Sequence, residues 1–423
     1  MFLFDLERWW EILSAIRKNK FRTFLTAFGV FWGIFMLIIM LGSGTGLKNG
    51  VYRGFGDFAT NSVFMWTMST TESYNGLPRG RWWNFRNADI TALRSHIPEI
   101  AVLAPRIQAW GGEGSNNVVR GEKTGAFFIY GDYPEWNRID PVNMLEGRFI
   151  NQADIDLKRK VAVIGTRVRD MLFNHGEQVT GEYIRIQNVY FKIIGVFEPR
   201  STDVNFGGDK AQSIHLPFTT LQHVYNYRDV VGWFALTAKP DVKVSEVEQK
   251  AISLLKRRHN IAPHDKQAVG SFNMEEQYNK MQGLFTGINV LIWIVGIGTL
   301  FAGVIGISNI MLVVVKERTR EIGIQRAIGA SPLKITSQII MESVFLTIIA
   351  GYFGLVAGVG LVELIHFALA QSGNESQMFY NPEIHFATAL KSLFILVVAG
   401  ALAGLIPARK AVSIKPIDAL RHE

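Results

Sequence analysis

Residues 281–315 read MQGLFTGINVLIWIVGIGTLFAGVIGISNIMLVVV, a run of 35 residues without a charged side chain. A helix of this length, at about 1.5 Å per residue, extends roughly 50 Å, whereas the hydrocarbon core of a membrane is about 30 Å thick. The run therefore predicts a transmembrane helix, assigned to residues 283–315. One end of the apolar run must project beyond the lipid.

Three further apolar segments are as long as a membrane crossing and nearly free of charge: residues 23–47, 335–365 and 386–408. Only Glu342 and Glu363 interrupt the third crossing, and Lys391 lies near the start of the fourth. Segments of this length and polarity predict transmembrane helices. Four crossings place both termini on the same side of the membrane.

Lys and Arg side chains gather beside these crossings on one side only. Because positive residues near the ends of crossings stay preferentially in the cytoplasm, residues 316–334 and the tail at residues 409–423 are predicted to be cytoplasmic. The short loop at residues 366–385 has no Lys or Arg and, like residues 48–282, is predicted to lie outside. The cations that set this orientation are Arg8, Arg17, Lys18, Lys20, Arg22, Lys316, Arg318, Arg320, Arg326, Lys334, Arg409, Lys410, Lys415 and Arg421.

Residues 1–22 are predicted to form an amphipathic helix at the cytoplasmic membrane surface. Arg and Lys accumulate toward the first crossing, and apolar side chains recur at helical spacing, which is typical of an interfacial helix. Packing of the same apolar stripe against the transmembrane helices explains the pattern equally well. The stripe consists of Phe2, Leu6, Trp9, Leu13 and Ile16.

Composition excludes several classes of protein. Only 19% of the residues are charged, against about 25% in soluble globular proteins. The net charge of +8 comes mostly from the segments beside the crossings, so binding of nucleic acid is not indicated. The 423 residues include no Cys, which excludes disulfides, thiolate metal sites and Cys nucleophiles.

The long outer segment, residues 48–282, reads as a mixed α+β domain. Short β-rich runs bounded by Gly, Pro and Asn begin at Val161, Tyr183, Val189 and Gly232. A helix with a capping box is predicted from Ser245 and Glu248, and residues 274–282 are predicted to run helically into the second crossing. The sequence thus predicts an α-helical membrane protein with four transmembrane helices and a large mixed α+β extracytoplasmic domain inserted between helices 1 and 2.

The outer domain offers little chemistry. It contains neither HExxH nor GxSxG, and its His residues lack a recognised metal-binding spacing with carboxylates. For each His, a structural or surface role is therefore favoured over catalysis. No catalytic residue and no metal ligand is assigned. The His residues concerned are His175, His215, His223, His259 and His264.

Between the second and third crossings, residues 316–335 read KERTREIGIQRAIGASPLKI. The pattern predicts a short helix that Gly329 terminates, followed by a new helix with Ser331 at its cap and Pro332 in its first turn. Charged side chains together with Ile322, Ile324 and Ile328 give the short helix a polar and an apolar surface, as a docking helix needs. The alternative is a loop that only anchors the chain on the cytoplasmic side. That role would require the basic residues alone.

Four stretches of this chain resemble permeases of the MacB and FtsX family of ABC transporters. Residues 316–332, KERTREIGIQRAIGASP, resemble the family's cytoplasmic coupling segment, and residues 17–33, RKNKFRTFLTAFGVFWG, resemble its first transmembrane segment. EGRFINQADIDLKRKVAVIG, followed by IRIQNVYFKIIGVFEP, resembles its outer domain, and IPARKAVSIKPIDALRHE resembles its C-terminal signature. The match runs in order along nearly the whole chain.

The resemblance implies a dimerising four-helix permease whose outer domain has two subdomains, one inserted at about residues 106–218. It implies a separate ABC ATPase subunit, because no GxxxxGK[ST] loop occurs in the sequence. We therefore expect a stand-alone permease without an ATPase domain and without a cofactor, while the partner binds ATP and Mg. The residues assigned to ATPase coupling are Glu317, Arg318, Arg320, Glu321, Ile322, Arg326 and Gly329.

Further expectations follow from the same resemblance. They are a location in the bacterial inner membrane in contact with lipid, a second permease copy in a homo- or heterodimer, and in exporters a periplasmic adaptor protein with an outer-membrane channel. The expected function is mechanotransmission, in which ATP hydrolysis moves the periplasmic domain to export macrolide-like drugs, peptides or other envelope cargo. The alternatives are an FtsX-like signalling or regulatory scaffold and a lipoprotein-releasing permease. An enzyme in the outer domain lacks any motif.

Two features inside the crossings concern packing. GxxxG pairs in three segments are candidates for helix packing or dimer contacts, and packing within the chain is at least as well favoured as a dimer. Glu342 is a carboxylate in an apolar helix, which costs about 2.5–3.5 kcal/mol at the helix centre. It should therefore face protein or lie near the inner interface, either in a structural pair or with a direct part in transmission. The glycines are Gly29, Gly33, Gly354, Gly358, Gly400 and Gly404.

Overall fold

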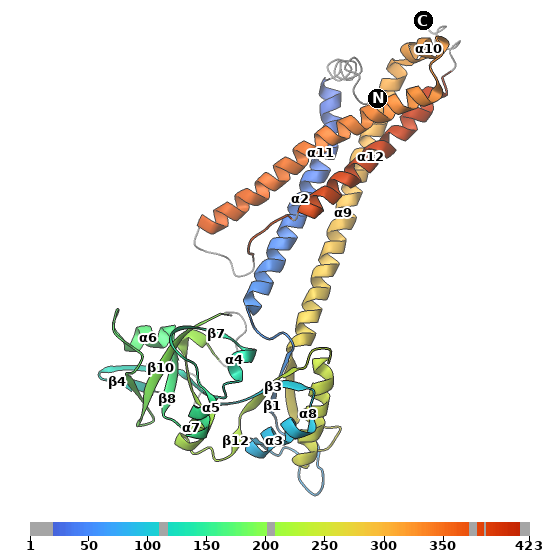
Figure 1. Ribbon diagram of the computed structural model, residues 1–423. Helices are drawn as coiled ribbons and strands as arrows, with labels where there is room; N and C mark the ends of the chain where they lie inside the picture. The colour runs from blue at the N-terminus through green and yellow to red at the C-terminus, as the bar shows by residue number, and fades with distance from the viewer. Residues whose placement is uncertain (1–19, 110–116, 201–207, 372–378, 385, 415–423) are drawn as a thin grey trace. The chain divides into compact units, whose positions relative to one another are not determined.

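The computed structural model describes residues 20–109, 117–200, 208–371, 379–384 and 386–414 (Figure 1). They belong to two compact units: unit 1 comprises Met1–Val51 and Gly283–Glu423, and unit 2 comprises Tyr52–Gln282. The amphipathic helix predicted at residues 1–22 lies outside the described residues, apart from residues 20–22. The same holds for residues 415–423 of the predicted tail.

Unit 1 is built from helices that are long and apolar enough to cross a membrane. Among the described residues there are four of them, and the domain between the first two is mixed α and β, so the predicted fold class is confirmed. The first helix continues past the predicted crossing to Phe55, and the second already begins at Met274, as residues 274–282 predicted. The helices are α2 (Lys20–Phe55), α9 (Met274–Glu317), α11 (Pro332–Gln371) and α12 (Phe386–Val412).

Close approach between these helices depends on glycine. A β-carbon at Gly354 would lie 2.5 Å from the carbonyl oxygen of Phe31, and one at Gly404 would lie 2.9 Å from the α-carbon of Ile340. Such distances require a neighbouring backbone to shift, so these pairs of helices pack at a separation that only glycine permits. The other GxxxG residues also contact helices of the same chain, and these residues are Gly29, Gly33, Gly358 and Gly400. All six glycines thus serve packing inside the chain.

Unit 2 is organised by one large sheet. Within the described residues, twelve strands join it in the order β14-β1-β13-β3-β6-β11-β8-β10-β9-β4-β5, with β7 paired to β10. A separate pair is formed by β2 (Phe85–Arg86) and β12 (Val230–Val231). The strands of the large sheet are β1 (Ser62–Thr67), β3 (Ile100–Gln108), β4 (Asn117–Arg120), β5 (Lys123–Ala126), β6 (Phe128–Asp132), β7 (Val142–Gly147), β8 (Val161–Gly165), β9 (Tyr183–Ile186), β10 (Val189–Pro199), β11 (Ser213–Pro217), β13 (Trp233–Ala238) and β14 (Val269–Asn273).

The order of these strands divides the sheet by origin in the chain. The first four, β14 to β3, come from the two ends of the outer segment, and the rest come from its middle part, which the chain enters after β3 and leaves through β11. The strands predicted from Val161, Tyr183, Val189 and Gly232 are confirmed as β8, β9, β10 and β13. The helices of unit 2 are α3 (Asn87–His96), α4 (Trp136–Ile139), α5 (Gln152–Asp156), α6 (Thr166–Leu172), α7 (Phe218–Val224) and α8 (Val244–Arg258), with a 3₁₀ turn at Lys210–Gln212.

The predicted capping box of α8 is wrong. The helix begins one residue earlier than expected, at Val244, whose N–H donates to the Glu275 carboxylate at the start of α9 (2.9 Å). Glu248, expected to cap, instead accepts a hydrogen bond from the Asn273 side-chain amide (2.8 Å). A carboxylate distant in sequence therefore supplies the cap that a local motif predicted.

A buried charged cluster joins the two groups of strands where β3 pairs with β6. The Arg106 guanidinium donates two hydrogen bonds to the Asp132 carboxylate (2.5 and 2.8 Å) and lies over the Trp136 ring, 3.5 Å from its centroid. His215 Nδ1 lies 2.5 Å from the same carboxylate. Burial raises the pKa of Asp132, but Arg106 and His215 outweigh it and hold that pKa below its usual value. The carboxylate therefore stays ionised beside Arg106.

We expect Asp132→Ala to lower the free energy of unfolding by about 3–5 kcal/mol, because it leaves the Arg106 charge buried without a partner. The measurement is urea unfolding of the purified chain followed by tryptophan fluorescence. Asp229→Ala is the matched control, since it breaks an ion pair with Arg86 whose side chains are 53% and 45% exposed and should cost about 0–1 kcal/mol. Equal losses in the two variants would contradict this account of the cluster.

Candidate functional site

A short connection joins the two longest described helices of unit 1. It comprises residues 317–331 and contains the charged loop singled out in the sequence; we call it the α9–α11 connection. Helix α10 (Thr319–Ala327) begins almost directly after α9, and the N–H of Ile322 donates to the carbonyl of Arg318 (3.0 Å). With so few residues between helices, α10 has little freedom to move relative to the end of α9.

Local caps define the turn that follows α10. Gly329 has φ +103°, a conformation that side chains with a β-carbon rarely adopt. The Ser331 hydroxyl oxygen accepts a hydrogen bond from the N–H of Lys334 (3.4 Å), and Pro332 is the first residue of α11. The predicted helix end at Gly329 and the predicted start at Ser331 and Pro332 are thus confirmed.

Arg318 lies between two carboxylates. Its Nη1 is 3.0 Å from Glu342 Oε1 on α11, and its Nε is 2.9 Å from Glu321 Oε2 on α10. The Glu342 side chain is only 7% exposed, so it faces protein, one of the two placements expected for it. Burial lowers the pKa of Arg318, but the two carboxylates outweigh it and raise that pKa above its usual value. One guanidinium thus ties the end of α9 to both α10 and α11.

Arg326 ties the other end of α10 to a different helix. Its Nη1 donates to the carbonyl oxygen of Val412 (2.7 Å) and also to that of Ile414, at the carboxyl end of α12. Carbonyl groups at a helix C-terminus lack partners within the helix and carry partial negative charge, so a cation is favourable there. Arg326 therefore fastens α10 to α12.

Exposed aliphatic side chains occur on the connection and at the start of α11. Ile328 is 82% exposed, Leu333 80% and Ile324 41%, whereas Ile322 is only 8% exposed and packs inside. Aliphatic side chains exposed to this degree next to charged ones are typical of a surface that another protein covers. We call Ile324, Ile328 and Leu333 the apolar tip.

The seven predicted coupling residues thus divide into two groups. Those that build the connection are Arg318, Ile322, Arg326 and Gly329, and those exposed on it are Glu317, Arg320 and Glu321. Sequence reasoning missed Leu333 and the bond between Arg318 and Glu342. An apolar residue directly after Pro332 was the available signal for Leu333. No pattern in the sequence pairs residues 24 positions apart on different helices.

Unit 2 places Ser213, His215 and Asp132 in a row that resembles an acyl-transfer triad, and this arrangement bears on the enzyme alternative. Ser213 Oγ is 3.1 Å from His215 Nε2, but its hydroxyl donates to the carbonyl of Lys210 (2.7 Å) and the residue is 1% exposed. The adjacent cavity measures about 20 Å³, which is room for roughly one water molecule. A substrate cannot reach this serine, so the cluster is structural.

Metal chemistry finds no support either. Within the ranges that the structure describes, no group of three or more His, Asp or Glu side chains could hold a metal ion. In unit 1, two arginines fix α10 against its neighbours, and the side chains of the apolar tip are exposed.

Known protein families match both units. The family described as MacB-like periplasmic core domain matches residues 23–254, and the FtsX-like permease C-terminal family matches residues 293–416. The first match covers more than half of the chain, and the second covers the α9–α11 connection. The resemblance stated from the sequence motifs is confirmed.

Relatives of known name extend over nearly the whole chain. The macrolide export ATP-binding/permease protein MacB of Shewanella sp. (strain W3-18-1) is 29% identical over 97% of this chain and 60% of its own length. The pyoverdine export ATP-binding/permease protein PvdT of Pseudomonas entomophila (strain L48) is 28% identical over 99% of this chain and 59% of its own length. The chain therefore spans about three fifths of the length of the curated relatives it matches.

Among solved structures, the periplasmic region of MacB from Actinobacillus actinomycetemcomitans covers 53% of this chain and 94% of its own, with 18% identity and a TM-score of 0.42. A likeness of this size carries no argument about the fold. The family matches, together with the four membrane-capable helices, describe a multi-pass membrane protein. This chain belongs to the MacB/FtsX family of ABC transporter permeases.

Proposed function

We propose that this chain is the permease of an ABC transporter in which a separate ATPase binds the α9–α11 connection and moves the outer domain. The observation that carries the proposal is the exposed apolar tip, which lies on and next to α10, the helix that Arg318 and Arg326 fasten to α11 and α12. A docking surface that transmits force must be rigid where the partner binds. ATP and Mg would be bound by the partner, since no GxxxxGK[ST] loop occurs in these 423 residues.

The second crossing is suited to carry the movement. Helix α9 is continuous over 44 residues, which corresponds to about 66 Å at 1.5 Å per residue. Its last residue, Glu317, adjoins the connection, and its first, Met274, follows β14 without a linker. Along the chain, a single helix therefore links the connection to the sheet of unit 2.

We infer that the termini and the connection are cytoplasmic, that unit 2 is periplasmic and that the membrane is the bacterial inner membrane. The basic residues beside the crossings support this orientation. Large apolar side chains along α9 are more than half exposed, which supports contact with lipid or a second permease copy. They are Leu284, Val290, Leu291, Ile294, Phe301 and Ile305. An adaptor protein and an outer-membrane channel complete the proposed exporter.

The cargo is inferred from the relatives. Proteins named for export of macrolides and of pyoverdine are similar to this chain along almost its full length. We propose that the chain serves export of a drug-like, peptide or other envelope cargo.

Ile328→Asp should weaken binding of the ATPase more than tenfold, because it places a charge where an aliphatic side chain would be buried. The measurement is co-purification of the tagged chain with ABC ATPases of the same organism. Leu157→Asp is the matched control, since Leu157 is an aliphatic residue of unit 2 that is 65% exposed. This variant should bind the ATPase as well as the natural chain does. If Ile328→Asp also binds normally, the apolar tip is not the docking surface.

Glu342→Gln should uncouple ATP hydrolysis from the movement of unit 2, because the Arg318 guanidinium loses the carboxylate that joins it to α11. Loss of a charged hydrogen-bond partner costs about 1–3 kcal/mol. We expect the ATPase to bind and turn over ATP while the nucleotide-dependent change in distance between spin labels on unit 2 of two copies disappears. Glu363→Gln changes an exposed carboxylate of the same helix and should leave the distance change intact. An unchanged response in Glu342→Gln would refute the bracing role.

Single cysteines test the orientation cleanly, because the natural chain has none. A membrane-impermeant maleimide added to intact spheroplasts should label Tyr183→Cys, whose natural side chain is 54% exposed, and leave Arg320→Cys unlabelled until the membrane is opened. Labelling in the opposite order would reverse the topology and remove the proposed ATPase contact.

A further inference from the structure

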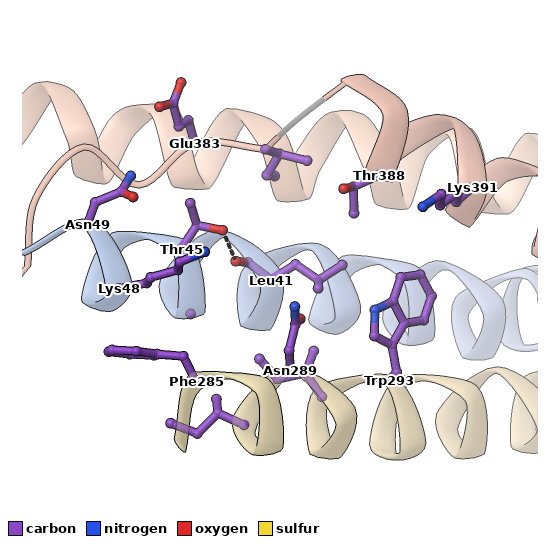
Figure 2. A pocket seen from close by; sticks show the side chains of 14 residues that line it. Leu41, Thr45, Lys48, Asn49, Phe285, Asn289, Trp293, Glu383, Thr388 and Lys391 are labelled. Carbon is purple, nitrogen blue, oxygen red and sulfur yellow. Dashed lines mark hydrogen bonds between the residues drawn. The ribbon is translucent and has the colours of Figure 1, made fainter. Parts of the chain in front are cut away.

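A cavity of about 280 Å³ lies within unit 1 between α2, α9 and the chain leading into α12 (Figure 2). Hydrogen bonds hold the wall of this cavity in place. The Asn49 side-chain amide donates to the carbonyl of Asn381 (3.0 Å), and the N–H of Tyr380 donates to the carbonyl of Gly46 (3.0 Å). These bonds hold residues 379–384 against α2 and close one side of the cavity.

The lining of this cavity is rich in hydrogen-bond donors. Figure 2 shows Asn289 and Trp293 projecting from α9 toward α2 and α12, with Thr388 and Lys391 on the facing helix. Two of the polar side chains, Lys48 and Lys391, are cations, and one, Glu383, is an anion that accepts a hydrogen bond from Asn381 (2.8 Å). Lys391 forms no ion pair with any residue that the structure describes. The Lys391 ammonium group in this lining therefore favours an anionic group.

A second, apolar hollow adjoins the first and shares Trp293 and Lys391 with it. It measures about 940 Å³, and apart from Lys391 its lining is entirely apolar or aromatic. Phe394 on its wall is 70% exposed and Leu390 56%. A polar cavity that shares a lysine and a tryptophan with an apolar groove matches a ligand with a charged head and a hydrocarbon chain.

We propose that these two hollows form a binding site for one phosphate-bearing glycerolipid of the surrounding bilayer. The phosphate would lie in the polar cavity near Lys391 and Lys48, and an acyl chain would follow the groove past Trp293 and Phe394. Ammonium groups bind phosphate as point charges, and an amide such as Asn289 adds a donor without adding charge. The site goes beyond the proposed export function and does not depend on the ATPase.

The test is native mass spectrometry of the purified full chain in a phosphate-free, non-ionic detergent, with added palmitoyl-oleoyl phosphatidylglycerol as the probe. The expected result is one retained lipid per chain. Lys391→Gln should lower its occupancy about tenfold, the loss typical of a charge-assisted hydrogen bond, and Lys391→Arg should restore it. Phe394→Ala should also lower occupancy, because it shortens the apolar wall.

Matched controls separate this site from lipid that coats any membrane helix. Lys334→Gln changes an exposed lysine at the other end of unit 1, and Phe353→Ala changes a phenylalanine of α11 that is 61% exposed. Neither should alter occupancy. The proposal is overturned if either control lowers occupancy as much as its partner variant, or if Lys391→Gln has no effect.

Two further probes distinguish the source of the ligand. Palmitoyl-oleoyl glycerol, which has the same chains without phosphate, should bind at least tenfold more weakly, and equal binding would remove the role of the cations. Inorganic phosphate should not displace the lipid at equal concentration, and displacement would mean that the cavity binds a free anion only. None of these results depends on ATPase binding. The lipid-site proposal can therefore be refuted while the proposed function stands, and the proposed function can be refuted while the lipid site stands.

Discussion

A charged or hydrogen-bonding group inside the hydrocarbon core must find its partner within the protein, because lipid offers none. The crossings of this chain obey the constraint with continuous helices that satisfy their own backbone groups. The buried carboxylate of Glu342 obeys it through Arg318, which lies outside the apolar run of α9. The bond that neutralises Glu342 therefore also fixes the connection between α9 and α11, and the position of α10 follows from it.

This arrangement explains how a nine-residue helix can be a rigid surface. An isolated helix of that length is unstable in water, since helices shorter than about 12 residues gain too little to offset nucleation. Here Arg318 holds one end of α10, Arg326 holds the other against the carbonyls of α12, and Ile322 is buried between. The apolar tip consists of side chains that these contacts leave exposed, so the contacts that stabilise the helix also decide which residues stay on the surface.

In unit 2, too, buried charged groups need partners within the protein, but there they form a closed packing cluster. Arg106, Asp132 and His215 satisfy one another where strands from the ends of the outer segment meet strands from its middle. Nothing there is left for a substrate, because each polar atom of the row already has a partner and the adjacent cavity measures only about 20 Å³. Ser213 beside His215 belongs to this structural network. The location of charge within the fold, rather than the types of residue present, separates the exposed α9–α11 connection from the packing cluster of unit 2.

The sequence by itself determined the four crossings, the mixed outer domain, several of its strands and the caps at Gly329 and Ser331, because apolar length, β-rich runs and turn residues are local signals. Only the tertiary structure decided that Glu342 pairs with Arg318, that Arg326 caps α12, that Glu275 caps α8 and that the GxxxG glycines pack inside the chain. Each of these contacts joins residues on different elements, often far apart along the chain. Which donor meets which acceptor is settled when the elements pack, and a single sequence carries no local pattern for that choice.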